Sequence, residues 1–185
     1  MIPENFAERR LTDSAQRVIR HIADRALDRG MVAGELTEGT AGMLAVLSIL
    51  RWERKVALAV LEQLGADLDR LAREIDEGIR AEGLVARNPD GPQFRLSSTG
   101  ERQLEVDTGT PLHPLVEQAE RESQEIGHDW VGTEHLLLAA VRSACPRFRE
   151  VLDCHRVTHE RVRESVLDLL GPPPEAGSLP ESSTD

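Results

Sequence analysis

The stretch VLEQLGADLDRLAREI (residues 60–75) has a diverged second copy in the same chain, VLDCHRVTHERVRESV (residues 151–166). The two stretches align without a gap at an offset of 91, and Arg51 and Arg142 keep that offset. The pairs that match include Val60 with Val151, Leu61 with Leu152, Arg70 with Arg161 and Ile75 with Val166. Similarity at a fixed spacing indicates a repeated structural unit. The chain is therefore predicted to contain one unit twice.

The first copy is predicted to be longer than the second. Upstream of the matched stretches, Gly30 pairs best with Gly127, at an offset of 97 instead of 91. The change in offset implies about six residues inserted between Gly30 and Arg51.

Each copy is predicted to be a unit of four helices. Apolar residues from Leu68 to Ile79 follow the spacing of one buried helix face, with charged residues on the other. Thr12, Thr37, Asp67, Thr110, Thr133 and Thr158 mark helix starts, and Gly30, Gly65, Gly127 and Gly171 mark helix ends. The expected helices cover residues 12–29, 38–52, 54–64 and 67–81, then 111–126, 133–143, 146–153 and 157–170.

The segment between the copies has a different character. Asn88-Pro89-Asp90-Gly91-Pro92 is a dense turn signal between Leu84-Val85 and Phe94-Arg95-Leu96, which favours a β-hairpin. The last stretch is rich in Pro, Ser and acidic residues, which is typical of a disordered tail. We therefore expect an all-α fold with a small hairpin insertion. Its parts are an N-terminal arm (1–10), repeat 1 (11–82), a hairpin linker (83–109), repeat 2 (110–171) and the tail (172–185).

Composition argues against several classes of function. A net charge of −11 and only 3% aromatic residues disfavour nucleic-acid binding, which needs clustered basic and stacking side chains. No apolar run approaches the ~20 residues of a membrane span, and MIPENFAERR lacks the apolar core of a signal peptide. We expect a cytoplasmic protein in which Cys145 and Cys154 are reduced, partly buried thiols.

The stretch GHDWVGTEHLLLAAV (residues 127–141) gathers polar residues at the start of an apolar helix. His128, Glu134 and His135 are metal-ligand types, and His155 and His159 form an i, i+4 pair next to Cys154. No HExxH, CxxC or GxSxG motif supports a metal or catalytic site, so we expect no metal, no cofactor and no enzyme activity. A structural explanation needs no ligand: Thr133 as N-cap, followed by Glu134 at the positive end of the helix.

The same motif, Gly-His, three further residues and then Gly-Thr-Glu-His-Leu-Leu-Leu, resembles the N-terminal (Clp R) repeat domain of Clp-type AAA+ unfoldases, particularly the ClpC and ClpA kind. LTDSAQRVI (11–19) and VALAVLEQLGADLDRL (56–71) extend the likeness over most of the chain. That family's domain is a duplicated four-helix unit, which agrees with the repeat found from the offsets.

The resemblance implies a docking module for adaptors and substrates that, in the ClpC kind, binds phosphorylated arginine. The Glu of the motif there faces the guanidinium, and a Thr at the start of the first helix helps to bind the phosphate. Carried over to this chain, repeat 2 supplies Glu134, with Thr133 beside it, and Thr110. Repeat 1 offers Thr12 and Glu38, but its motif is eroded, because no His follows Thr37-Glu38.

The 185 residues contain no GxxxxGK[ST] motif, so we expect no ATPase activity from them. The resemblance then implies an accessory or adaptor factor whose partners are a Clp ATPase, a Clp peptidase, an adaptor or a substrate protein. A different interpretation takes GLVARNPDGPQFRLSSTGERQL (83–104) as the wing of a winged-helix transcription factor. The slightly acidic charge of residues 80–107 disfavours contact with phosphates.

Overall fold

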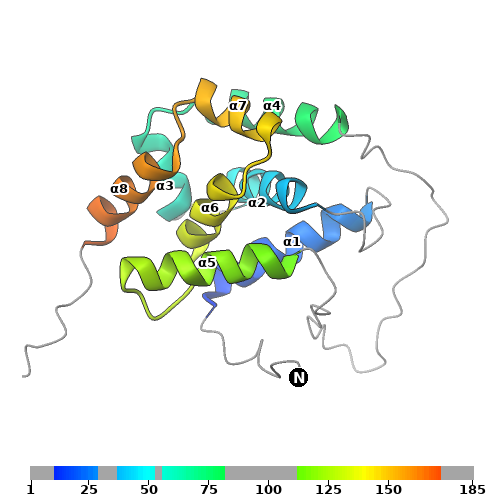
Figure 1. The fold of residues 1–185 in the computed structure, drawn as a ribbon. Coiled ribbons are helices and arrows are strands. Elements are labelled where there is room, and N and C mark those ends of the chain that lie inside the picture. The colour runs from blue at the N-terminus through cyan, green and yellow to red at the C-terminus, as the bar shows by residue number, and fades with distance from the viewer. Residues whose placement is uncertain (1–10, 29–36, 53–55, 82–111, 172–185) are drawn as a thin grey trace, which may run out of the picture.

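The computed structural model describes residues 11–28, 37–52, 56–81 and 112–171 (Figure 1). These ranges form eight α-helices, and each boundary lies within two residues of its predicted position. The predicted hairpin at 83–98 lies outside the described residues. The helices are α1 (Asp13–Asp28), α2 (Glu38–Trp52), α3 (Val56–Gln63), α4 (Leu68–Ala81), α5 (Leu112–Ile126), α6 (Thr133–Arg142), α7 (Pro146–Cys154) and α8 (His159–Leu170).

Four of the predicted N-caps are confirmed by side-chain hydrogen bonds. The Oγ1 or Oδ1 atom of each residue accepts a hydrogen bond from the backbone N–H three residues later, at 3.0–3.4 Å. These residues are Thr12, Thr37, Asp67 and Thr158. Thr110 lies outside the described residues. The prediction for Thr133 is wrong, because the N-cap of α6 is Gly132 and Thr133 is the first helical residue.

Three helix ends share one hydrogen-bond pattern. In α5, the N–H of Gly127 donates to the Gln124 carbonyl at 3.0 Å, and the next N–H donates to the Ser123 carbonyl at 2.9 Å. The turns after α3 and α7 have the same two bonds, around Gly65 and Arg156. This pattern needs a left-handed residue, and φ is 74° at Gly65, 85° at Gly127 and 57° at Arg156. Gly171 also follows a helix end as predicted, whereas Gly30 lies outside the described residues.

In the turns after α3 and α7, residues 91 positions apart in the two copies have the same backbone conformation and the same hydrogen bonds. Gly65 and Arg156 are equivalent by this offset, and both are left-handed. The N–H groups of Ala66 and Val157 donate to the carbonyls of the equivalent leucines, at 3.1 and 2.9 Å. The N-caps Asp67 and Thr158 are equivalent as well. The two copies therefore have the same local structure where the sequence alignment pairs them.

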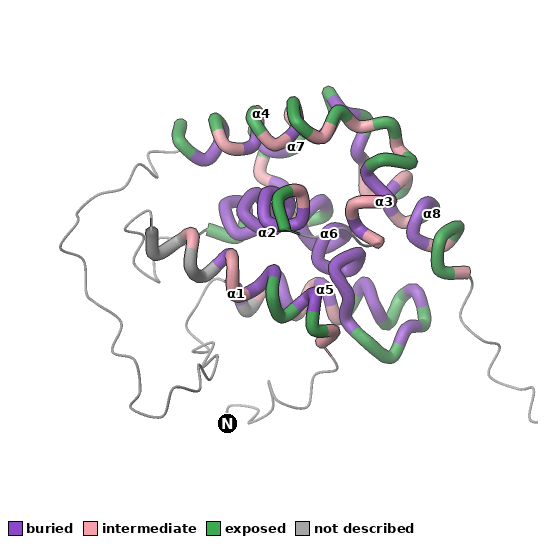
Figure 2. Tube along the Cα trace, turned by 180° about the vertical axis from the view of Figure 1, so that it is seen from behind, coloured by how far each residue is buried: buried purple, intermediate pink, exposed green. Residues whose placement is uncertain are grey.

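The two copies pack into one body around α2 and α6 (Figures 1 and 2). Helix α3 of copy one packs against α8 of copy two, and α4 packs against α7, so each copy covers the other. All residues of α2 from Gly39 to Ile49 and of α6 from Thr133 to Val141 are buried. The helices approach closely at Gly42, where a Cβ atom would lie 3.3 Å from the carbonyl oxygen of Ala140.

Within the described ranges, no helix combines the length and apolar character that crossing a membrane requires. Cys145 and Cys154 are not joined by a disulfide, and Cys145 is half-buried. The expectation that both thiols are partly buried is wrong for Cys154, which is exposed at the last residue of α7.

Candidate functional site

The loop between α5 and α6 holds the sequence motif in place. Gly127 ends α5 in a left-handed conformation, which turns the chain back along the helix. The Ser123 hydroxyl on α5 donates to the carbonyl of Trp130 at 2.6 Å. A parallel β-bridge between Leu11 and Val131 then joins this loop to the segment just before α1, which begins at Asp13. The positions of residues 128–134 are thus determined by both α5 and the start of α1.

Helix α6 is capped by its own histidine. The backbone N–H of Gly132, the N-cap, donates to Nδ1 of His135 at 2.9 Å. Because Nδ1 accepts this bond, the proton of the neutral ring is on Nε2. Nε2 lies 3.0 Å from Nδ1 of His128 and donates to it. Burial and the charge of His128 lower the pKa of His135 to about 4, so the ring is neutral at pH 7.

The carboxylate of Glu134 is enclosed by the protein, and its residue is only 4% exposed. Burial raises its pKa, and the nearby backbone N–H of Glu134, the Trp130 indole and the Thr133 hydroxyl partly oppose that rise. The carboxylate occupies the space above Gly132, where a Cβ atom would overlap it. Any side chain at position 132 would therefore displace the Glu134 carboxylate, although the φ of −101° is open to any residue.

His128, Glu134 and His135 place potential ligand atoms within 4.8 Å of one another, all buried. However, Nδ1 of His135 is occupied by the Gly132 N–H, and Nε2 carries the proton donated to His128. A metal bound at Nε2 of the neutral ring would require the ring proton to move to Nδ1, which could then no longer accept the Gly132 N–H that caps α6. The 3.3 Å approach of Glu134 to His135 Nδ1 is likewise no ion pair, because the ring is neutral at pH 7. The arrangement is therefore built for hydrogen bonds.

Trp130 packs against His128 of this cluster and was missed in the sequence. Its ring stacks on that of His128, with centroids 4.5 Å apart and planes 10° apart, yet the residue is 39% exposed. The available signal was compositional: Trp130 is one of two tryptophans in a chain with few aromatic residues, and it lies inside the motif.

Of the predicted site residues, Thr12, Thr133 and Glu134 come from adjacent segments. Thr12 caps α1, and its N–H donates to the Val131 carbonyl at 3.0 Å, so the N-terminus of α1 lies beside that of α6. Thr110 lies outside the described residues. Glu38 is exposed at the first position of α2. Counted from the N-cap Thr37, the position of Glu134 is taken by Gly39, so copy one has no equivalent carboxylate there.

Comparison with known proteins agrees with this geometry. Residues 10–155 match the family described as the Clp repeat (R) N-terminal domain. The chain belongs to this family. The resemblance seen in the motif is therefore confirmed. The match spans residues 83–104, the segment of the winged-helix interpretation, which lies outside the described residues.

Two curated relatives of this Clp repeat chain belong to larger proteins. Chaperone protein ClpB from Oceanobacillus iheyensis is 26% identical over 163 residues. Negative regulator of genetic competence ClpC/MecB from Bacillus subtilis is 28% identical over 163 residues. Each alignment covers 88% of this chain and 17% of the relative. Among solved structures, the Hsp104 N-terminal domain from Candida albicans superposes with a TM-score of 0.60 at 12% identity, covering 88% of this chain and 92% of that one. This last likeness supports the fold.

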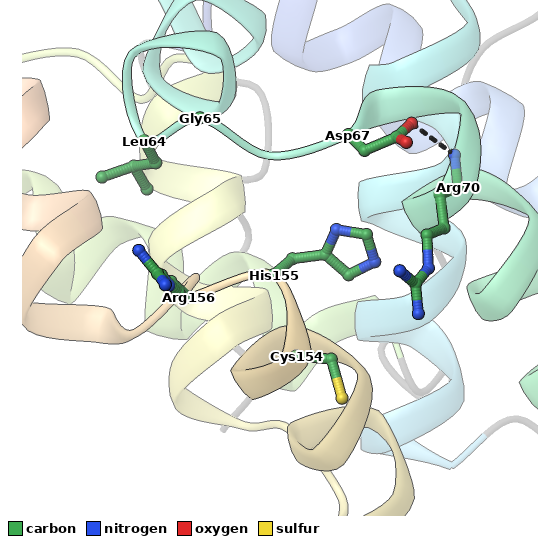
Figure 3. Close-up of a pocket in the computed structure, with 7 residues that line it drawn as sticks. All are labelled: Leu64, Gly65, Asp67, Arg70, Cys154, His155 and Arg156. Atoms are coloured by element: carbon green, nitrogen blue, oxygen red, sulfur yellow. Dashed lines mark hydrogen bonds between the residues drawn. The ribbon is translucent and has the colours of Figure 1, made fainter.

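A pocket lies where the two Clp repeats meet, away from the motif (Figure 3). It has a volume of about 220 Å³ between the turn after α3 and the turn after α7. Nε2 of His155 lies 3.0 Å from the Glu74 carboxylate, which also accepts from Arg70. Hydrogen bonds from Arg70 and then His155 lower the pKa of Glu74. The lining is Leu64, Gly65, Asp67, Arg70, Cys154, His155 and Arg156.

The histidine pair near Cys154 does not converge on one site. His155 contacts Glu74 across the repeat junction, whereas His159 Nε2 lies 2.9 Å from the buried Glu122 carboxylate on α5. Each imidazole therefore has its own acidic partner in a different part of this Clp repeat fold.

Proposed function

We propose that this chain is a non-catalytic docking module for protein partners of a Clp-type unfolding system, and that it holds phosphorylated arginine at Glu134. One observation carries the proposal: the buried carboxylate of Glu134 lies at the start of α6 within 4.8 Å of His128, on which a partly exposed tryptophan, Trp130, stacks. Membership of the Clp repeat family supports the docking role.

The chemistry of the site suits a phosphorylated guanidinium. A guanidinium presents parallel N–H donors that pair with both oxygens of a carboxylate. The N-termini of α1 and α6 lie side by side through the Leu11–Val131 bridge, and helix N-termini attract phosphate through their backbone N–H groups and dipole. Thr12 and Thr133 provide hydroxyl groups at these two ends. The guanidinium of phosphoarginine thus has a complementary carboxylate, and its phosphate has complementary helix N-termini close to that carboxylate.

The proposal assigns one such pocket, in copy two. Glu38 is exposed, and Gly39 stands where Glu134 stands relative to the helix cap, so copy one lacks the enclosed carboxylate. Thr110 remains a proposed contributor on sequence grounds alone.

The partners we propose are a Clp ATPase, a Clp peptidase, an adaptor or a substrate protein in the cytoplasm. These 185 residues carry no GxxxxGK[ST] motif, so unfolding would use a motor supplied from elsewhere. The net charge of −11 suits partners with basic or amphipathic surfaces.

Calorimetry with a phosphoarginine peptide tests the site. Glu134→Gln keeps the shape of the side chain but removes its charge, so we expect binding to weaken by about 1–3 kcal/mol. Glu38→Gln is the matched control in copy one, and its affinity should equal that of the unchanged protein. If the Glu134→Gln variant is folded by circular dichroism and binds the peptide as tightly as the unchanged protein, phosphoarginine binding at Glu134 is overturned.

A further inference from the structure

The junction pocket, between the turn after α3 and the turn after α7, presents two arginine side chains in a chain whose net charge is acidic (Figure 3). Arg70 comes from copy one and Arg156 from copy two, and Figure 3 shows the ring of His155 between them. The pocket is therefore formed only when the two copies are packed together. Glu134 is not among the residues that line it.

The acidic groups at the junction pocket are already hydrogen-bonded within the protein. One oxygen of Glu74 accepts from Arg70 Nε at 2.7 Å, and the other lies 3.0 Å from His155 Nε2. Asp67, the N-cap of α4, accepts the backbone N–H of Arg70 at 3.0 Å. These contacts fix the start of α4 and orient both the guanidinium and the imidazole.

The two guanidinium groups keep donors that no described residue uses. Arg70 donates to the described residues through Nε alone, so its two terminal amino groups are open to a ligand. Arg156 is exposed, and its side chain forms no hydrogen bond or ion pair with a described residue. Charge-assisted hydrogen bonds from a guanidinium favour carboxylates. Both sides of the His155 ring are thus suited to an acidic group.

His155 adds a buried acceptor between the two cations, since the residue is only 8% exposed. Hydrogen bonds from Arg70 and then His155 lower the pKa of Glu74, so this carboxylate is ionised at pH 7 and can only accept. The proton of the neutral His155 ring is therefore on Nε2, which leaves Nδ1 as an acceptor. Nδ1 has no partner among the described residues and is open to the pocket.

Arg156 holds its position in a strained backbone conformation. Its φ is 57°, whereas the equivalent residue of copy one is Gly65. A non-glycine residue in this region is destabilising, and residues held in this way are often found at binding sites. Glycine would relieve the strain but would remove one of the two cations from the pocket.

We propose that the junction pocket binds an acidic peptide segment of a protein partner: two acidic side chains pair with Arg70 and Arg156, and a backbone N–H between them donates to Nδ1 of His155. An extended peptide carries these groups together, because backbone N–H groups lie between its successive side chains. This site is separate from Glu134 and does not depend on phosphoarginine binding there.

Calorimetry with the peptide acetyl-Gly-Glu-Gly-Glu-Gly-amide tests the pocket, and the same peptide with glutamine in place of glutamate should bind far more weakly. Arg156→Gly and Arg70→Gln each remove one guanidinium and should weaken binding about tenfold. Because Arg156→Gly relieves the strained φ, a folding defect does not explain its loss of affinity. Arg73→Gln is the matched control, since Arg73 is exposed on the same helix as Arg70 but outside the pocket, and its affinity should be unchanged.

Cys154 reports where the peptide binds. Its exposed thiol lines the junction pocket, whereas Cys145 is half-buried and lies outside the lining. Alkylation by iodoacetamide, followed by mass spectrometry of each cysteine, should slow at Cys154 in proportion to the fraction of protein bound to peptide. The rate at Cys145 should stay the same.

Three results would overturn the acidic-peptide site: no binding by the unchanged protein, equal affinity in both pocket variants, or an unprotected Cys154 at saturating peptide. Binding of free glutarate as tight as that of the peptide would instead assign the pocket to a small dicarboxylate. Glu134→Gln should bind the acidic peptide normally, and Arg156→Gly should bind a phosphoarginine peptide normally. Failure of either site therefore leaves the other standing.

Discussion

At the residue scale, His135 couples the start of α6 to pH. Its Nδ1 accepts the capping N–H of Gly132 only while unprotonated, and its ring is fully buried. Burial and His128 lower its pKa from 6.5 to about 4. As pH falls below 6.5, the unfolded chain takes up this proton before the folded chain does. The free energy of unfolding should therefore decrease between about pH 6.5 and pH 4, and His135 should cause no further loss below pH 4.

The size of this effect is on the order of 3 kcal/mol, from the difference between 6.5 and about 4. Urea unfolding at several pH values measures it, with His135→Gln as the control. A glutamine here can accept the Gly132 N–H and donate to His128, but it does not titrate. Glu134 acts in the opposite direction, because burial raises its pKa. The difference between the two proteins therefore isolates His135, and identical pH profiles would show that the cap does not titrate.

Arg156 is held in a conformation that suits glycine. Its φ is 57°, in a turn where the equivalent residue of copy one is Gly65. A non-glycine residue held at a left-handed φ destabilises the folded protein by about 1–3 kcal/mol. Glycine avoids this strain, but its greater freedom in the unfolded chain offsets part of the gain. Arg156→Gly should therefore raise the free energy of unfolding by about 0.5–1 kcal/mol. Gly65→Ala is the converse test and should lower it, since a Cβ there meets no atom within 4 Å and only φ opposes it. Denaturant unfolding of both variants measures the two signs; matching signs would contradict this account.

At the element scale, the sequence identified the helices but not the start of α6. Apolar spacing and caps are local signals, and they predicted each boundary within two residues. Gly132 and Thr133 are both acceptable N-caps, so the sequence alone could not decide which of the two residues caps α6. The deciding contact is the side chain of His135 on the Gly132 N–H, together with a Glu134 carboxylate that leaves no space for a Cβ. That information exists only after the helix has formed.

A buried carboxylate joins three helices of copy two. Glu122 on α5 is fully buried and accepts from Arg142 at the end of α6, at 2.9 Å, and from Gln118, at 2.8 Å. Its other oxygen lies 2.9 Å from His159 at the start of α8. Burial alone would raise the pKa of Glu122, but these hydrogen bonds lower it overall. The stability that it provides is thus present above about pH 4.5 and is lost as pH falls through its folded pKa.

Glu122→Gln should lower the free energy of unfolding by about 1–3 kcal/mol at pH 7, because three partners lose a charged acceptor. Glu125→Gln is the matched control: its side chain is 48% exposed and lies 3.3 Å from the same Arg142. An exposed ion pair of this kind is worth about 0–1 kcal/mol. Equal losses in thermal or urea unfolding would mean that α5, α6 and α8 are not joined through Glu122.

At the scale of the whole molecule, the duplication was predictable but the way in which the copies combine was not. Offsets in the sequence pair equivalent turns, such as those at Gly65 and Arg156, because each turn is determined locally. The packing of α3 on α8 and of α4 on α7 joins residues at least 65 positions apart in the sequence, and no local pattern encodes it. The same holds for the bridge that places Thr12 beside the motif of the other copy.

Because each copy covers the other, we expect neither to unfold alone. Helices α2 and α6 are buried against each other at the centre, so loss of either copy exposes the core of the other. The fluorescence of each tryptophan reports the unfolding of one copy, because Trp52 ends α2 of copy one and Trp130 precedes α6 of copy two. In Trp52→Phe and in Trp130→Phe, the fluorescence midpoint in urea should coincide with the circular dichroism midpoint of the same variant. Comparison within each variant removes any effect of the substitution on overall stability, and a fluorescence midpoint below the dichroism midpoint in either one would show that its copy opens independently.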